Sequence, residues 1–298
     1  MSENRTLTIA MAQKSQTAIG TPFSVFEGNV RAIASMRDEH GNTPEMIVFP
    51  EMHLFGTGDL DEEHAYFAQC EAASDMHDGL IDEFSRLAKE LGIWLIPGTI
   101  PEKNAENGIF NTAPVFSPDG ELVASYRKIC PWRPFEHYTP GDSFTVFDIP
   151  GKGRVGIMIC YDAWFPEISR QIAWLGADII INPVFTTTPD RKQELVLAQA
   201  NAIVNQTFIA SLNAPAPYGV GQSLLVDPEG EIVAETQDAD EHLLITTIDL
   251  GKVSQVRRDG TAGSNKMWEQ FRLGEPPVAL PLYQGSIDPE RWNARQQP

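Results

Sequence analysis

The sequence has few cysteines and no long apolar run. Its 298 residues include three cysteines, Cys70, Cys130 and Cys160. This odd, low count excludes a disulfide-built scaffold and is typical of a reducing compartment. No run approaches the roughly 18 apolar residues that cross a bilayer. The N-terminal residues lack the basic and apolar regions of a signal peptide. We therefore expect a cytoplasmic protein without a membrane span.

Positive charge is also scarce. There are 22 lysines and arginines against 41 aspartates and glutamates, so the net charge is −19. Such a surface repels the phosphates of nucleic acids and the anionic headgroups of membranes. Hydrophobic residues make up 42% of the chain, which is ordinary for an ordered globular protein. A small molecule is therefore a better candidate partner than nucleic acid or membrane.

The spacings typical of metal sites are missing. His53, His64 and His137 show neither an HExxH nor a CxxC pattern. The acidic run at 59–63 lacks the pattern of a calcium loop and is expected to be a solvated loop. No local signature of a papain-like or caspase-like protease is present. We expect neither a metal nor an organic cofactor.

Apolar periodicity predicts alternating strands and helices. Helices are expected at 23–38, 77–91, 165–175 and 190–205, and the main strands at 7–11, 46–49, 93–100, 155–159, 178–182 and 208–212. Two similar turns, Pro118-Asp-Gly120 and Pro228-Glu-Gly230, predict hairpins between further extended runs. The pattern indicates a layered α/β fold with mixed sheets. No linker divides residues 1–265, whereas the Pro-rich segment 266–298 is expected to form an extended C-terminal arm.

Four residues capable of chemistry lie at predicted strand ends or in an adjoining loop. Cys160 follows the strand 155–159 and precedes a helix, Glu51 follows the strand 46–49, and Lys128 ends an extended run. Glu136 lies in the proline-rich loop 131–141. Taken alone, Cys160 is better explained as a buried structural cysteine and Glu51 as a solvated loop acid, and Lys128 can be a surface charge. Together they offer a nucleophile, a general base and an oxyanion donor.

The motifs around these residues resemble those of the nitrilase superfamily of carbon–nitrogen hydrolases. The resemblance rests on Phe49-Pro50-Glu51, on Tyr126-Arg127-Lys128 followed by Glu136, and on Ile159-Cys160-Tyr161-Asp162. It implies a four-layer α-β-β-α sandwich whose subunits pair into homodimers or larger assemblies. It further implies that Glu51 is the general base, Cys160 the nucleophile and Lys128 the oxyanion stabiliser. Glu136 would position the substrate amide, and the backbone N–H of Tyr161 would complete the oxyanion hole.

The residues near Cys160 narrow the substrate. The chain lacks the Trp-Glu-Asn that follows the cysteine of true nitrilases, and it has no arginine at 161–166 to hold a substrate carboxylate. Arg133 or Arg191 could hold one instead. Residues 126–136 resemble the corresponding loop of aliphatic amidases and formamidases. The sequence therefore predicts an amidase for a small or medium primary amide.

Four aromatic side chains could line an apolar acyl pocket: Trp132, Phe135, Trp164 and Phe185. Core packing explains each of them equally well. Three alternatives to the amidase remain. They are a hydrolase of N-carbamoyl amino acids or amines, an amidase that feeds ammonia to a separate synthetase, and a catalytically silent binding or scaffold protein on the same fold.

Overall fold

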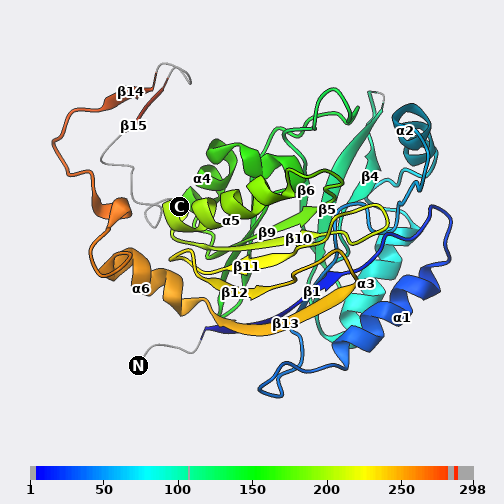
Figure 1. Ribbon diagram of the computed structural model, residues 1–298, viewed down its shortest axis with the longest axis horizontal. Helices are drawn as coiled ribbons and strands as arrows, with labels where there is room; N and C mark the ends of the chain where they lie inside the picture. Colours follow the sequence, from blue (N-terminus) through cyan, green and yellow to red (C-terminus); the bar gives the residue numbers. More distant parts are fainter. Residues whose placement is uncertain (1–4, 107, 281–284, 288–298) are drawn as a thin grey trace.

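Two β-sheets packed face to face form the centre of the molecule (Figure 1). The computed structural model describes residues 5–106, 108–280 and 285–287. The first sheet contains β1 (Thr6–Gln13), β2 (Met46–Val48), β3 (Trp94–Ile96), β4 (Ile100–Lys103), β5 (Ile109–Phe116), β6 (Leu122–Arg127) and β13 (His242–Asp249). The second contains β7 (Thr145–Ile149), β8 (Gly153–Ile157), β9 (Ile179–Val184), β10 (Phe208–Asn213), β11 (Leu224–Val226) and β12 (Ile232–Glu235).

Side chains alternate between two apolar layers along each central strand. Ile9 and Met11 of β1 point into the core between the sheets, whereas Ala10 and Ala12 face the helices outside. Helices α1 (Phe23–Ala34) and α3 (Gly79–Leu91) cover the first sheet. Helices α4 (Pro166–Trp174) and α5 (Arg191–Asn205) cover the second (Figure 1). These layers confirm the expected α-β-β-α sandwich.

The acidic run at 59–63 is partly helical, which corrects the expectation of a solvated loop. Helix α2 (Glu62–Glu71) begins there, and the side chain of Asp61 accepts a hydrogen bond from the backbone N–H of His64. Acidic residues suit this position because they satisfy free N–H groups and face the positive end of the helix dipole. The run therefore starts a helix.

The chain after the sandwich continues along its side. Helix α6 (Gly251–Asp259) follows β13, and the short helix η2 (Met267–Glu269) buries Trp268 against Ala173 of α4. Strands β14 (Val278–Leu280) and β15 (Gly285–Ile287) then form a hairpin away from the sheets (Figure 1). The rest of the expected arm, 281–284 and 288–298, lies outside the described residues. Within the described ranges, no helix is long and apolar enough to cross a membrane.

Parallel pairing brings the strand ends that carry the candidate residues to one edge. Strands β1, β2 and β3 run parallel in the first sheet, and β8, β9 and β10 run parallel in the second. Loops at the carboxyl ends of parallel strands are the usual place for sites in α/β proteins. The residues after β2, β8 and β9 therefore lie where an active site would be expected.

The turn after β2 is held by a close backbone contact that only glycine permits. Gly98 has φ +92°, and a Cβ there would clash with the carbonyl oxygen of Pro50, next to Glu51. We expect Gly98→Ala to lower the free energy of unfolding by at least about 3 kcal/mol, combining left-handed strain with overpacking. Gly92→Ala is the matched control, because Gly92 has φ +64° with open space around it. It should cost about 1 kcal/mol. Chemical denaturation measures both, and equal losses would contradict the clash.

Candidate active site

Glu51 connects the two sheets through its carboxylate. The side chain is almost fully buried. Its Oε1 accepts hydrogen bonds from Asn111 Nδ2 at 2.7 Å and Lys128 Nζ at 3.0 Å, both in the first sheet's half of the molecule. Its Oε2 accepts one at 2.9 Å from the backbone N–H of Phe185, directly after β9 of the second sheet. The turn places Glu51 by putting Met52 in a left-handed conformation, φ 52°.

Lys128 lies fully buried between two glutamates. Its Nζ is 3.0 Å from Glu51 Oε1 and 2.8 Å from both carboxylate oxygens of Glu136. Glu136 is held in turn by the backbone N–H of Trp132 at 2.7 Å. Burial by itself would lower the pKa of Lys128, but Glu136 and Glu51 outweigh it and raise the pKa well above its ordinary value. The lysine is therefore a fixed positive charge.

Cys160 occupies a sharp turn from strand to helix. It begins the short helix η1 (Cys160–Trp164) after β8, and its backbone is left-handed with φ 46°. A non-glycine residue in this conformation costs on the order of 1–3 kcal/mol and such strain is common at functional sites. The surrounding structure must therefore hold the turn in place.

Asp162 supplies that support. Its carboxylate accepts hydrogen bonds from the backbone N–H of Ile159 at 2.9 Å, the backbone N–H of Cys130 at 2.8 Å and the hydroxyl of Tyr126 at 2.8 Å. Burial raises the pKa of Asp162 to about 6, against the effect of these donors. The residue ties the Cys160 turn to the segment that carries Lys128.

The surroundings of the Cys160 thiol disfavour its thiolate form. Burial raises its pKa well above the ordinary value, and Glu51 raises it further, while Lys128 opposes both. Burial also raises the pKa of Glu51, which has the Cys160 side chain among its hydrogen-bond partners. Neighbouring carboxylates thus outweigh the lysine and the helix start that favour a thiolate.

Two connected cavities open onto these residues. The inner one has a volume of about 30 Å³ and is lined by Cys160, Tyr161 and Glu194 among others. The outer one has a volume of about 450 Å³ and reaches Glu51 at its base. Trp132, Glu136, Phe185 and Thr187 line both, so the two form one cleft.

The structure distributes the predicted aromatic residues unevenly. Trp132 and Phe185 line both cavities, and Phe135 lines the outer one, where its ring centroid is 4.4 Å from that of Trp132. Trp164 is not among the described residues lining either cavity. It packs beside Tyr161 with a centroid distance of 6.0 Å. Three of the four predicted aromatic residues therefore line the cleft.

Sequence reasoning missed several residues that hold the site. They are Asn111, Asp162, Glu194 and the backbone N–H of Phe185. Asn111 gave one usable signal, because it and Thr112 are the polar residues of the otherwise apolar strand β5. Glu194 accepts hydrogen bonds from the hydroxyl of Thr186 at 2.7 and 2.9 Å. A backbone donor such as Phe185 leaves no mark in a sequence.

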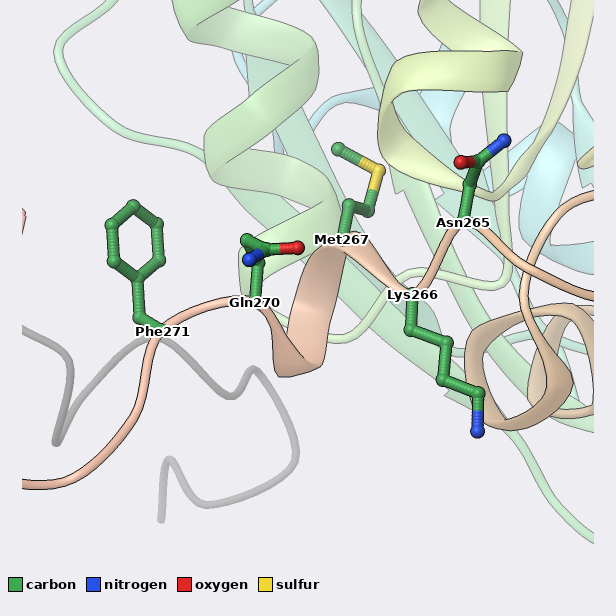
Figure 2. A pocket seen from close by; sticks show the side chains of 5 residues that line it. All are labelled: Asn265, Lys266, Met267, Gln270 and Phe271. Atoms are coloured by element: carbon green, nitrogen blue, oxygen red, sulfur yellow. The ribbon is translucent and has the colours of Figure 1, made fainter.

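A separate hollow lies beside the C-terminal segment. It has a volume of about 260 Å³ and is lined by Asn265, Lys266, Met267, Gln270 and Phe271 (Figure 2). It shares no lining residue with the cleft at Cys160. No cysteine, histidine or carboxylate is among its described lining residues, so it lacks the groups needed for hydrolysis. Across the described part of the chain, no cluster of three or more potential ligands could hold a metal ion.

Comparison with known proteins identifies the family. The family profile of carbon-nitrogen hydrolases matches residues 8–258. Omega-amidase NIT2 of Homo sapiens is 35% identical over 192 residues, covering 59% of this chain and 68% of the relative. This chain belongs to the carbon-nitrogen hydrolase family, within the nitrilase superfamily.

Solved structures agree on the fold. Saccharomyces cerevisiae Nit3, described as a member of branch 10 of the nitrilase superfamily, superposes with a TM-score of 0.73 at 25% identity, covering 85% of this chain and 94% of that one. An amidase from Nesterenkonia sp. superposes with a TM-score of 0.65 at 22% identity, covering 87% of this chain and 95% of that one. The second likeness, at its low identity, concerns the fold alone.

A buried histidine next to the site predicts a loss of stability in acid. His53 is fully buried against the rings of Phe49 and Phe26, and neither ring nitrogen has a hydrogen-bond partner within the described structure. Burial lowers its pKa to about 3. Below a pH of about 6.5, the ordinary pKa of histidine, His53 binds a proton in the unfolded chain but not in the folded chain. The free energy of unfolding therefore falls as the pH falls.

We expect His53→Phe to remove this loss. Between pH 7 and pH 5 the free energy of unfolding of the wild type should fall by about 2 kcal/mol more than that of the variant. Chemical denaturation at both pH values measures the difference. His64→Gln is the control, since His64 is exposed and Asp61 raises its pKa. Parallel pH profiles for wild type and His53→Phe would refute the assignment.

Proposed function

We propose that the protein hydrolyses a small or medium primary amide to a carboxylic acid and ammonia, through a thioester on Cys160. The observation that carries this proposal is the set of bonds of 2.8–3.0 Å that joins Lys128 to Glu51 and Glu136, with the Cys160 side chain among the hydrogen-bond partners of Glu51. A base, a fixed cation and a nucleophile at one end of a cleft suit acyl transfer. The similarity to an omega-amidase supports the amide as substrate.

The first half-reaction forms the thioester. Glu51 takes the thiol proton of Cys160 as the sulfur attacks the carbonyl carbon, which avoids a free thiolate in a site that disfavours one. Negative charge moves to the carbonyl oxygen, where Lys128 and the backbone N–H of Tyr161 stabilise it. The C–N bond then breaks, Glu51 returns the proton to nitrogen, and ammonia leaves.

The second half-reaction releases the acid. Glu51 takes a proton from water as the water oxygen attacks the thioester carbon. The carbon–sulfur bond breaks, the carboxylic acid forms, and the proton returns to the sulfur of Cys160. Glu136 orients the substrate amide while its own position is set by Trp132 N–H and Lys128. The proposed reaction needs neither an oxidant nor a cofactor.

The shape of the cleft supports a substrate of modest size. The outer cavity of about 450 Å³ lies within the usual range of roughly 300–1,000 Å³ for small-molecule sites. Phe135, Phe185 and Trp132 give it an apolar wall. The three free thiols fit the cytoplasm, where a reducing environment preserves them.

We also propose that the protein forms a homodimer or a larger homo-oligomer through its outer helices. Helix α5 exposes Val196, Ile203 and Val204, and Val196 is 64% accessible. Apolar side chains gathered on one exposed helix often mark an interface. Light scattering should give at least twice the mass of one chain, and Val196→Glu should weaken the association. A monomer at micromolar concentration would contradict this.

The decisive test is ammonia release by wild type and Cys160→Ala. The panel contains short aliphatic amides, an aromatic amide, amino acid amides, an N-carbamoyl amino acid and a nitrile. We expect Cys160→Ala to lose at least about 1,000-fold in kcat/KM on the amides. Mass spectrometry of the quenched wild type should show the acyl adduct that the variant lacks.

Cys130→Ser is the matched control. Burial raises the pKa of Cys130 to about 11, its thiol lines neither cavity among the described residues, and its role in the site is confined to its backbone N–H. We expect this variant to keep most activity. Turnover of the carbamoyl compound alone would overturn the substrate class. Silence of wild type and Cys160→Ala on every compound would favour the non-catalytic alternative.

A further inference from the structure

The charged side chains that line the cleft are of one sign. The inner cavity is lined by Glu136, Asp190 and Glu194, and the outer one by Glu51, Glu62 and Glu136. Neither cavity has an arginine or a lysine among its described lining residues. The imidazole of His137 also lines the outer cavity, packed 5.5 Å from the ring of Tyr66. Among lysine, arginine, aspartate and glutamate side chains, the described lining therefore presents only carboxylates to a substrate.

The cations closest to the cleft are already paired. Lys128 is balanced by the carboxylates of Glu51 and Glu136. Arg191, which sequence alone left open as a carboxylate ligand, is buried beside Glu194 at 2.9 Å, and its guanidinium also donates to Ser211 Oγ at 3.0 Å and Gln222 O at 3.0 Å. It lines neither cavity.

The second open candidate, Arg133, is also engaged. Its guanidinium donates to the backbone carbonyl oxygens of Glu136 at 2.5 Å and Tyr138 at 2.8 Å. These bonds fix the loop that carries Glu136. Neither arginine is among the described residues that line the two cavities. The remaining lining of the outer cavity consists of apolar residues and neutral hydrogen-bonding groups, including Phe55, Leu60 and Gln69.

We propose that this cleft selects amides whose acyl group carries no negative charge, and that it discriminates against amides that carry a carboxylate. The inference rests on the proposed amidase function and names the charge class of its substrate. A carboxylate entering the outer cavity would give up water, gain no cationic partner and approach Glu62 and Glu51. An uncharged acyl group makes apolar contacts there without this penalty. Rejection through an unfavourable charge is a general route to specificity.

The first experiment compares succinamide with succinamate. The two have the same length and nearly the same shape, and differ in having a carboxamide or a carboxylate at the far end. Butanamide is the apolar reference. We expect kcat/KM for succinamide to exceed that for succinamate at least about tenfold in the wild type, a ratio that like-charge contacts readily supply. An equal or higher kcat/KM for succinamate would overturn the inference while leaving the amidase proposal intact. Failure to hydrolyse any of the three faster than Cys160→Ala would overturn both.

The salt dependence of this ratio distinguishes an electrostatic preference from a steric one. Repulsion at the partly open outer cavity is screened at about 1 M salt, where the Debye length is about 3 Å. The ratio between succinamide and succinamate should therefore narrow as salt is raised. A ratio that does not change with salt would contradict an electrostatic origin.

A substitution at the rim of the outer cavity tests the effect of charge on substrate preference directly. Leu60 is 51% exposed and lines the outer cavity, so Leu60→Arg brings a cation to the entrance. We expect it to shift the ratio toward succinamate up to about fivefold, the range of an exposed charge pair. Phe67→Arg is the matched control, because Phe67 is 62% exposed on α2 and is not among the lining residues. The same shift in both variants, or none in Leu60→Arg, would overturn the inference.

Discussion

The buried ion network of Glu51, Lys128 and Glu136 is the constraint on which the site depends. Removing a lysine and a glutamate from water costs several kcal/mol per ion unless each charge is paired and hydrogen-bonded. Here Lys128 reaches both glutamates, and Glu51 satisfies its second oxygen on the backbone of Phe185, in the other sheet. The two sheets must therefore pack in one relative position for the charges to be satisfied. The same packing brings the end of β8, and with it Cys160, to the same edge.

Strain near the network is held by rigid surroundings. Met52, next to Glu51, and Cys160 both adopt left-handed backbone conformations. Gly98 allows the first turn to sit against its neighbour. Asp162 ties the second turn to the Lys128 segment through two hydrogen bonds, and a third holds the turn itself at Ile159. Because interiors are close-packed, such turns keep their geometry when a substrate binds. The fold itself therefore holds Glu51 and Cys160 in their positions.

The central strands and four helices could be predicted from the sequence, because hydrophobic periodicity and turn residues are local properties. The motifs that indicate the family could be read directly from it. The α-β-β-α layering came from resemblance, since which sheet faces which depends on contacts between distant residues. The helix at Glu62 was missed because its apolar face is weak and the acidic run outweighed it. In the site, Glu51, Lys128, Glu136 and Cys160 were named as candidates and the structure brings them together. Asp162 was not assigned a role, because it acts through buried acceptor geometry. Phe185 was named only as an aromatic of the acyl pocket, because its bond to Glu51 comes from its backbone.

The raised pKa of Cys160 bears on the resistance of this thiol to oxidation. Peroxides and electrophiles attack thiolates far faster than thiols, and oxidation beyond sulfenic acid is mostly irreversible. An enzyme whose reactive sulfur rests as a thiolate is exposed to this damage between turnovers. In the proposed mechanism the sulfur keeps its proton until a carbonyl carbon is in reach, so its reactivity is confined to the moment of use. Burial and the neighbouring carboxylates, which disfavour the thiolate, would then also protect the resting protein against oxidation.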